Sequence, residues 1–284
     1  MSDKMRNLVV RALSGVALFI VVVAAAYGGR YSYGALLGVI LFVGMLEFYR
    51  LAAASDAKPQ LVSGLVAGMT LFITGFTYFV GSGTTEGIDW AMVLGGAIYF
   101  ALLIPATFII ELFKNSTTPL RNIATTLMGV WYVAFPLTLM LFIPLMLGGG
   151  AWSAEAFLFY LFIVWANDVF AYLVGMSIGK HRLCERISPK KSWEGFIGGI
   201  AGAIGMGAIG AMVVGGSTIM WMGLAAIVAL TGVLGDLVES MFKREAGIKD
   251  SGNIIPGHGG MLDRFDAVLI SSPFAFIYLV IYLM

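Results

Sequence analysis

The feature that most constrains this chain is the recurrence of long apolar runs from one end to the other. Soluble proteins contain roughly a quarter charged residues, whereas this chain of 284 residues is 60% hydrophobic and only 12% charged. At about 20 residues per crossing, the runs predict an all-α, polytopic bundle of about nine transmembrane helices. The composition excludes a cytosolic globular enzyme, a disordered protein and a secreted disulfide scaffold. The expected spans lie near residues 12–28, 33–52, 61–81, 91–112, 122–147, 155–179, 193–214, 218–240 and 266–284.

The distribution of basic residues predicts the orientation of the bundle. Sixteen of the 17 Lys and Arg residues fall in the N-terminal tail and in alternate loops, and only Arg30 falls on the other side. Because cytoplasmic segments are enriched in Lys and Arg, we expect a cytoplasmic N-terminus and a C-terminus on the opposite side. The expected location is the cell (inner) membrane, with the active site at the cytoplasmic face. A net charge of +1 gives no general attraction to nucleic acid, and no such partner is expected.

The sequence predicts a single integral membrane domain, residues 1–284, whose two parts differ in chemistry. Residues 1–154 are expected to supply five scaffold helices with few polar groups. Residues 155–284 are expected to supply four helices and the site. In the first part, Glu47 and Arg50 lie three residues apart and are expected to form an ion pair without a functional role.

Two further features concern single helices. The run at 122–147 contains Pro136 and Pro144, so this crossing is expected to be bent or broken. The run at 193–214 is rich in glycine, with small residues four apart that let helices approach closely. It has two interpretations, packing within the chain or a homodimer interface.

The densest chemistry lies in the stretch Ser240–Asp266, SMFKREAGIKDSGNIIPGHGGMLDRFD. A cytoplasmic connector needs cations for topology, but not carboxylates interleaved with a PGHGG turn. Glycines let backbone N–H groups approach phosphate oxygens closely. Asp263 and Asp266 would share one helix face, and carboxylates without soft ligands suit a hard cation such as Mg²⁺. Zinc is disfavoured because the chain has two histidines and one cysteine.

This stretch resembles the signature of the phosphatidate cytidylyltransferases, the CDP-diacylglycerol synthases. The shared spacing is S-x-F-K-R-x4-K-D-x-G-x2-I-P-G-H-G-G-x2-D-R-x-D. Sixteen residues meet its fixed positions: Ser240, Phe242, Lys243, Arg244, Lys249, Asp250, Gly252, Ile255, Pro256, Gly257, His258, Gly259, Gly260, Asp263, Arg264 and Asp266. A second segment, from Asp168 to Gly195, is also similar to the family, although Ser192 stands where Thr is commoner.

The resemblance implies a nucleotidyltransferase that converts CTP and phosphatidic acid to CDP-diacylglycerol and pyrophosphate with Mg²⁺. It implies that Asp236 and Asp263 hold the metal, with Glu239 and Asp266 as further candidates. The expected catalytic residues are Asp236, Asp263, Lys243, Arg244, Lys249, Asp250, His258 and Arg264. The expected substrate-binding residues are Lys190, Lys191, Ser192, Gly257, Gly259, Gly260 and Asp168.

Several of these residues have a structural alternative. Asp236 could pair with Lys243 or Arg244. Asp168, about 16 Å below the cytoplasmic end of its helix at 1.5 Å per residue, could be a structural acid or could line a polar cavity. Ser192 is expected to cap the helix that follows it, and His258 is expected to contact phosphate rather than act as a base.

Two rival functions remain open from the sequence. One is a CTP-dependent transferase or kinase for another lipid, such as a polyprenol. The other is an ion-coupled transporter that uses Asp168 and Asp236 as coupling sites. A transporter would spread charges over both halves of the chain, whereas these charges gather toward one membrane surface.

Overall fold

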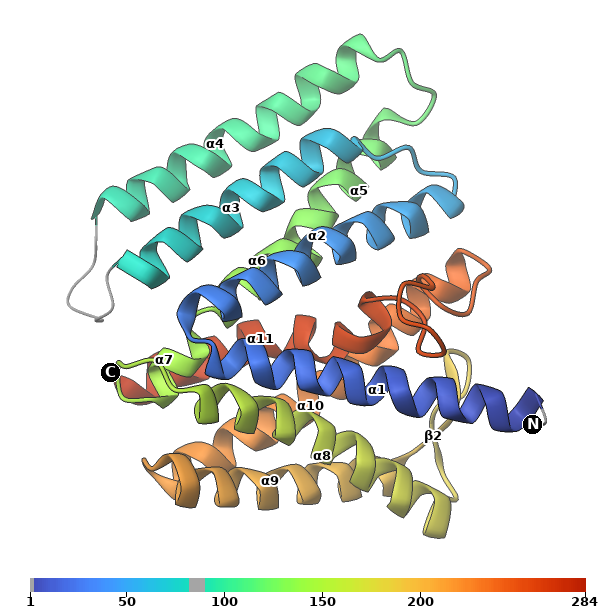
Figure 1. Cartoon of the computed structure of the whole chain (residues 1–284). Helices are drawn as coiled ribbons and strands as arrows, with labels where there is room; N and C mark the ends of the chain where they lie inside the picture. Colours follow the sequence, from blue (N-terminus) through green and yellow to red (C-terminus); the bar gives the residue numbers. More distant parts are fainter. Residues whose placement is uncertain (1–2, 82–89) are drawn as a thin grey trace.

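A computed structural model of the chain describes residues 3–81 and 90–284 and shows a helical bundle with one short hairpin (Figure 1). The expected fold class is confirmed, because nine helices of the described residues are long and apolar enough to cross a membrane. The elements are α1 (Asp3–Tyr27), α2 (Arg30–Ala54), α3 (Leu61–Gly81), α4 (Trp90–Phe113), α5 (Pro119–Gly129), the π-helix η1 (Val130–Ala134), α6 (Phe135–Met140), α7 (Ile143–Leu147), α8 (Ala154–Ile178), β1 (Arg182–Cys184), β2 (Ser188–Ser192), α9 (Trp193–Val214), α10 (Thr218–Glu245) and α11 (Leu262–Leu283).

The fifth crossing is broken, as its prolines predict. It runs from Pro119 to Leu147 but consists of α5, η1, α6 and α7 rather than one helix. Pro136 and Pro144 each lie in the first turn of their short helix. Pro144 follows the turn at residues 141–142, where a residue without an N–H is tolerated, whereas the backbone stays helical from η1 into α6 around Pro136. The π-turn and the breaks place this crossing against both α3 and α11, at the centre of the molecule.

The helices form two groups that meet along this broken crossing (Figure 1). Helices α8 to α11 pack together in the second half of the chain, whereas α2, α3 and α4 lie on the other side. Helix α1 runs beside α2 and α8. The two chain ends lie at opposite ends of the bundle (Figure 1), as an odd number of crossings requires. Their placement relative to the cytoplasm stays a prediction.

The glycine-rich helix α9 uses most of its small residues inside the chain. A side chain at Gly199 would collide with Asn167 of α8, and one at Gly207 would collide with Trp221 of α10. Gly205, by contrast, faces open space. The close approach of α9 to α8 and α10 therefore supports packing within the chain.

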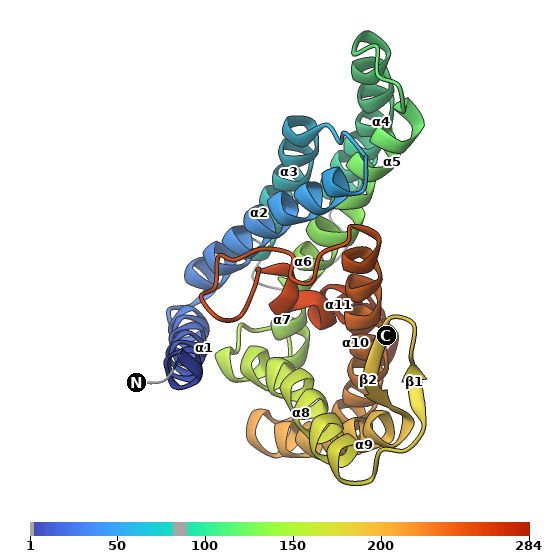
Figure 2. The ribbon, with the colours of Figure 1, turned by 90° about the vertical axis from the view of Figure 1, so that its right-hand side faces the viewer.

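The segment between α8 and α9 folds into an antiparallel hairpin, which an all-α prediction did not include. Strands β1 and β2 pair Arg182 with Ser192 and Cys184 with Ser188, and the hairpin packs against α9 (Figure 2). The Glu194 side chain closes its base, because it accepts a hydrogen bond from the backbone N of Lys180 at 3.1 Å and contacts His181 Nδ1 at 2.6 Å. The segment between α8 and α9, expected to be a loop, is thus a hairpin at one end of α8, α9 and α10.

Candidate active site

Two cavities meet at Asp168, at the end of the bundle where the signature loop lies. One, of about 280 Å³, lies between α8, the hairpin, α9 and α10. The other, of about 150 Å³, lies between α1, α8 and the start of α11. The first is lined by Asp168, Ala171, Tyr172, Leu183, Lys190, Lys191, Ser192, Phe196, Val233 and Asp236. The second is lined by Leu18, Val22, Leu161, Val164, Trp165, Asp168 and residues 263–268.

Three helices each bring at least one aspartate to the lining of these cavities. Asp168 of α8, Asp236 of α10 and Asp266 of α11 lie near enough for their charges to interact. Asp168 is exposed to both cavities, so it lines a polar cavity, which was one of its two predicted alternatives. Carboxylates placed together in a membrane protein face a cost of self-repulsion and desolvation that a bound cation or cationic side chain offsets.

Asp236 is paired with the hairpin rather than with the end of its own helix. Its Oδ2 atom lies 2.5 Å from Lys191 Nζ, and its Oδ1 accepts a hydrogen bond from Ser240 Oγ at 3.2 Å. The predicted alternative, a pair with Lys243 or Arg244, is wrong, because the fold brings strand β2 beside α10. Lys191 therefore connects the hairpin, which holds the predicted substrate-binding residues Lys190, Lys191 and Ser192, to Asp236 of α10.

Asp263 belongs to a second ion-pair network, centred on Lys243. Lys243 Nζ donates to Glu239 Oε2 at 2.6 Å and to Asp263 Oδ1 at 2.7 Å. The other oxygen of Asp263 accepts hydrogen bonds from Gly260 N at 2.7 Å, Ser251 N at 2.9 Å and Ser251 Oγ at 3.0 Å. All three carboxyl and ammonium side chains are largely buried, with exposed fractions of 1%, 13% and 4% for Glu239, Lys243 and Asp263.

The oxygen ligands of this region suit a hard cation, although no three of them converge on one point. Among the described residues, no group of three or more His, Cys, Asp or Glu side chains is close enough to hold a metal ion. Lys191 pairs with Asp236, and the single ammonium group of Lys243 pairs with both Glu239 and Asp263. Glu239 Oε1 is buried without a hydrogen-bond partner. The chemistry of the oxygen donors suits Mg²⁺, their present arrangement does not form a metal site, and the assignment of ligands stays a prediction.

The PGHGG sequence forms the tight turn that its glycines predict. Gly257 and Gly259 have φ values of 75° and 83°, and Ile255 pairs with Gly259 across the turn. His258 Nδ1 lies 2.7 Å from Ser14 Oγ of α1. Partial burial and the nearby charges of Arg264 and Arg11 lower the pKa of His258. These surroundings favour the neutral form of the imidazole.

The remaining predicted residues divide into two groups. Lys190 and Ser192 line the larger cavity, and Arg264 lines the smaller one. Ser192 caps α9 as expected, since its Oγ accepts a hydrogen bond from Gly195 N at 3.2 Å. The exposed side chains of Arg244, Lys249 and Asp250, and the glycines Gly257, Gly259 and Gly260, line neither cavity.

The chain is similar throughout its length to proteins of known class. The model of the cytidylyltransferase family matches residues 9–282. The phosphatidate cytidylyltransferase of Staphylococcus aureus is 33% identical over 276 residues, covering 95% of this chain and 98% of the relative. The enzyme of that name from Synechocystis is 29% identical over 302 residues, covering 97% and 96%. The chain belongs to the cytidylyltransferase family. The resemblance inferred from the signature is therefore confirmed.

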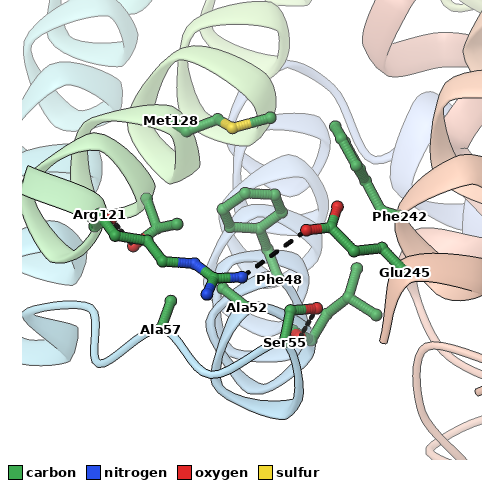
Figure 3. A pocket seen from close by; sticks show the side chains of 10 residues that line it. Phe48, Ala52, Ser55, Ala57, Arg121, Met128, Phe242 and Glu245 are labelled. Carbon is green, nitrogen blue, oxygen red and sulfur yellow. Dashed lines mark hydrogen bonds and ion pairs between the residues drawn. The ribbon is translucent and has the colours of Figure 1, made fainter. Parts of the chain in front are cut away.

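In this cytidylyltransferase-family chain, the signature maps to the end of α10, the following loop and the start of α11. A third cavity, of about 160 Å³, lies beyond it between α2, α5 and α10 (Figure 3). Phe48 and Phe242 face this cavity. An ion pair joins Arg121 Nη2 and Glu245 Oε1 at a distance of 3.7 Å. Both charged side chains are exposed, and none of the three aspartates lines it. It is therefore separate from the acidic site.

The ion pair predicted between Glu47 and Arg50 is wrong. Glu47 is fully buried, whereas Arg50 is exposed, and no ion pair joins them in the described part of the chain. Glu47 Oε2 instead accepts a hydrogen bond from the backbone N of Leu262 at 2.9 Å. The sequence does hold a signal for this partner: a single acid within an apolar helix is rarely without a buried partner.

Proposed function

We propose that this chain transfers the CMP moiety of CTP to phosphatidic acid, which yields CDP-diacylglycerol and pyrophosphate for phospholipid biosynthesis. The observation that carries the proposal is that Asp168, Asp236 and Asp266, together with Lys191 and Arg264, line two cavities that share Asp168. The relatives named phosphatidate cytidylyltransferase supply the substrate class.

The proposed reaction is an in-line displacement at phosphorus. An oxygen of the lipid phosphate attacks the α-phosphorus of CTP, the bond to the bridging oxygen of the β-phosphate breaks, and pyrophosphate leaves with that oxygen and its electron pair. A phosphate monoester has a second pKa of about 6, so the nucleophile is mostly a dianion at neutral pH. No general base is needed, which agrees with a His258 that contacts α1 rather than an aspartate of the site.

The two cavities suit the two substrates. The larger cavity presents Lys190, Lys191 and the start of α9, whose backbone N–H groups and dipole favour an anion. We assign it to the triphosphate. The smaller cavity has apolar walls from α1 and α8 and the cation Arg264 at its polar end, so we assign it to the lipid phosphate and the first part of its acyl chains. Asp168 lies where the two meet.

Magnesium is part of the proposal, with Asp236 and Asp263 as its main ligands and Glu239 and Asp266 as further ligands. When bound, the ion would neutralise charge on the triphosphate and on the departing pyrophosphate. The support for this placement is that all four residues carry carboxylate oxygens, the donors that Mg²⁺ prefers, and that Lys191 and Lys243 are the cations now paired with three of them. Binding would require at least one ammonium group to shift toward substrate phosphate. Chelation by EDTA should abolish activity, and added Mg²⁺ should restore it.

The protein is a multi-pass membrane protein, and we propose the cytoplasmic side of the inner membrane for its site. The support is the basic bias of the loops at that end and the cytosolic origin of CTP. A homodimer through α9 would have to use outward-facing positions such as Gly205, since its other glycines pack inside the chain.

A competition assay with purified, reconstituted protein tests the function. The protein receives Mg²⁺ and CTP with phosphatidic acid, diacylglycerol or a polyprenol as acceptor, and pyrophosphate and lipid products are measured. We expect pyrophosphate and a CMP-bearing lipid with phosphatidic acid alone. Phosphorylation of the polyprenol would instead support the kinase alternative. If none of the three acceptors supports activity, both lipid proposals are contradicted.

A further inference from the structure

A carboxylate of the first half lies directly against the signature loop. Glu47 belongs to α2, about 200 residues before the loop, yet its side chain has no exposed surface. The loop leaves room for it only because two positions lack side chains. A Cβ atom at Gly252 or Gly260 would collide with the Glu47 carboxylate. The absence of side chains at Gly252 and Gly260 therefore leaves room for the Glu47 carboxylate, and at Gly260 also for Ser251 Oγ.

Glu47 makes its contacts as an acceptor at the start of α11. Its Oε2 atom accepts from Leu262 N, the first residue of the helix, at 2.9 Å and lies 3.3 Å from Ser251 Oγ. The first N–H groups of a helix have no partner within the helix, and the positive end of the helix dipole favours a negative group there. Glu47 thus acts as a cap supplied by another part of the chain.

Ser251 joins this cap to the ion-pair network of the site. Its hydroxyl lies 3.3 Å from Glu47 Oε2 and 3.0 Å from Asp263 Oδ2. Asp263 in turn accepts from Lys243 through its other oxygen. A continuous path of polar contacts therefore runs from α2 through Ser251 to Asp263 and then to α10.

The position of Glu47 on α2 is itself fixed by packing. The next residue, Phe48, contacts Phe242 of α10 and Tyr132 of η1, with ring centroids 6.2 Å and 5.6 Å apart. Figure 3 shows Phe48 and Phe242 at the cavity between α2 and α10. Tyr49 donates a hydrogen bond to Thr126 O at 2.9 Å. Helix α2 is therefore held against both η1 and α10, and Glu47 is presented to the loop.

We infer that Glu47 is a positioning residue for the reaction, which fixes the signature loop and the orientation of Asp263 through Ser251 and the start of α11. This inference rests on the proposed function. It makes the first half of the chain a part of the active site's support rather than a passive scaffold. Glu47 touches neither substrate cavity, so its removal should change turnover more than nucleotide binding.

Variants at Glu47 test the inference against a matched control. Glu47→Ala removes the acceptor, whereas Glu47→Gln retains an oxygen that can accept from Leu262 N. Glu245→Gln makes the same chemical change at an exposed residue near the same end of the bundle. We expect Glu47→Ala to lower kcat at least about tenfold with the KM for CTP changed less than about threefold. Glu47→Gln should recover most of kcat, and Glu245→Gln should match the wild type.

Hydrogen exchange supplies a readout that does not depend on turnover. In Glu47→Ala, amide exchange in the peptide covering 250–262 should rise, while exchange in α9 stays at the wild-type level. Wild-type kcat in Glu47→Ala, or unchanged exchange in that peptide, would overturn the inference. Equal loss of kcat in Glu47→Gln and Glu47→Ala would also overturn it, because the acceptor would not be the group that matters. If the wild type forms no nucleotide lipid, the proposed function fails, and the exchange data still test the anchoring.

Discussion

Both halves of the molecule hold carboxylates among their helices, but these carboxylates have different partners. Glu111 of α4 is satisfied entirely by neutral partners, because it accepts hydrogen bonds from Gln60 Nε2, Asn122 Nδ2 and Ser116 Oγ at 2.9, 2.7 and 2.5 Å. It lines none of the three cavities described above. Asp168 of α8 has neither a hydrogen bond nor a close ion pair within the described part of the chain, and it lines two cavities. Asp236 and Asp263 are held by lysines.

This difference separates structural acids from acids available to a substrate. A carboxylate whose lone pairs are filled by amides and hydroxyls stabilises the fold and has little capacity left. A carboxylate paired with a lysine ammonium group, or with no group, can exchange that partner for a ligand. Burial alone therefore does not identify the site. The partners and the adjoining cavity do.

The largest effect is expected at Asp236. Asp236→Asn keeps the size of the side chain and the contact with Ser240 but removes the charge that holds Lys191. We expect kcat to fall at least ~100-fold, the scale of losing one preorganised electrostatic group, without loss of folding. Asp56→Asn is the matched control, since Asp56 is exposed with a φ of 63°, which asparagine tolerates. Near-normal turnover in Asp236→Asn would contradict the assignment of this acid.

A smaller effect is expected at Lys191. Lys191→Met retains most of the volume and removes the cation at the larger cavity. Because we place the triphosphate there, the KM for CTP should rise about tenfold, as for the loss of one charge-assisted contact of roughly 1.5 kcal/mol. The KM for phosphatidic acid should change less. Steady-state kinetics in mixed micelles measure both KM values. A larger rise in the KM for phosphatidic acid than in the KM for CTP would instead assign the larger cavity to the lipid.

Glu111 should show the opposite behaviour. Glu111→Ala leaves the amides of Gln60 and Asn122 without their buried acceptor, which costs about 1–3 kcal/mol per unsatisfied group. We expect a lower melting temperature in detergent but an unchanged kcat per folded molecule. A large loss of kcat in protein that remains folded would remove the contrast between the two halves.

The cap of α9 should have a modest effect on stability. Ser192→Ala removes the acceptor of Gly195 N, and such caps contribute about 1 kcal/mol. Ser192→Thr should retain this stability because it keeps the hydroxyl. Thermal unfolding of the three proteins measures the difference. If alanine and threonine behave alike, the hydroxyl does not cap the helix.

The smallest effect concerns pH. The pKa of His258 is lowered in the folded protein from an ordinary value of about 6.5. The unfolded chain therefore binds this proton more readily, and the fold loses stability as pH falls through and below that value. His258→Gln lacks this loss, so the melting temperature of the wild type should drop relative to the variant between pH 8 and pH 5. If the difference in melting temperature between the two proteins is constant from pH 8 to pH 5, the lowered pKa of His258 is contradicted.

The parts of this account that are local in sequence could be predicted from it. The apolar runs predict nine crossings, Pro136 and Pro144 predict the broken one, and Ser192 before an apolar run predicts its cap. The partners of Asp236 and Glu47 could not be predicted, because each lies on another segment that only the packed bundle brings near. Spacing fixes which residues share a helix face but not which helix that face meets.

The most direct test of the account follows the phosphorus atoms of CTP. The reconstituted protein is supplied with phosphatidic acid and CTP labelled at either the α- or the γ-phosphate, and the label in the lipid phase is measured. Attack on the α-phosphorus predicts that α-label enters the lipid and that γ-label is released as pyrophosphate. Label from the γ-position in the lipid, or none from the α-position, would contradict cytidylyl transfer at this site.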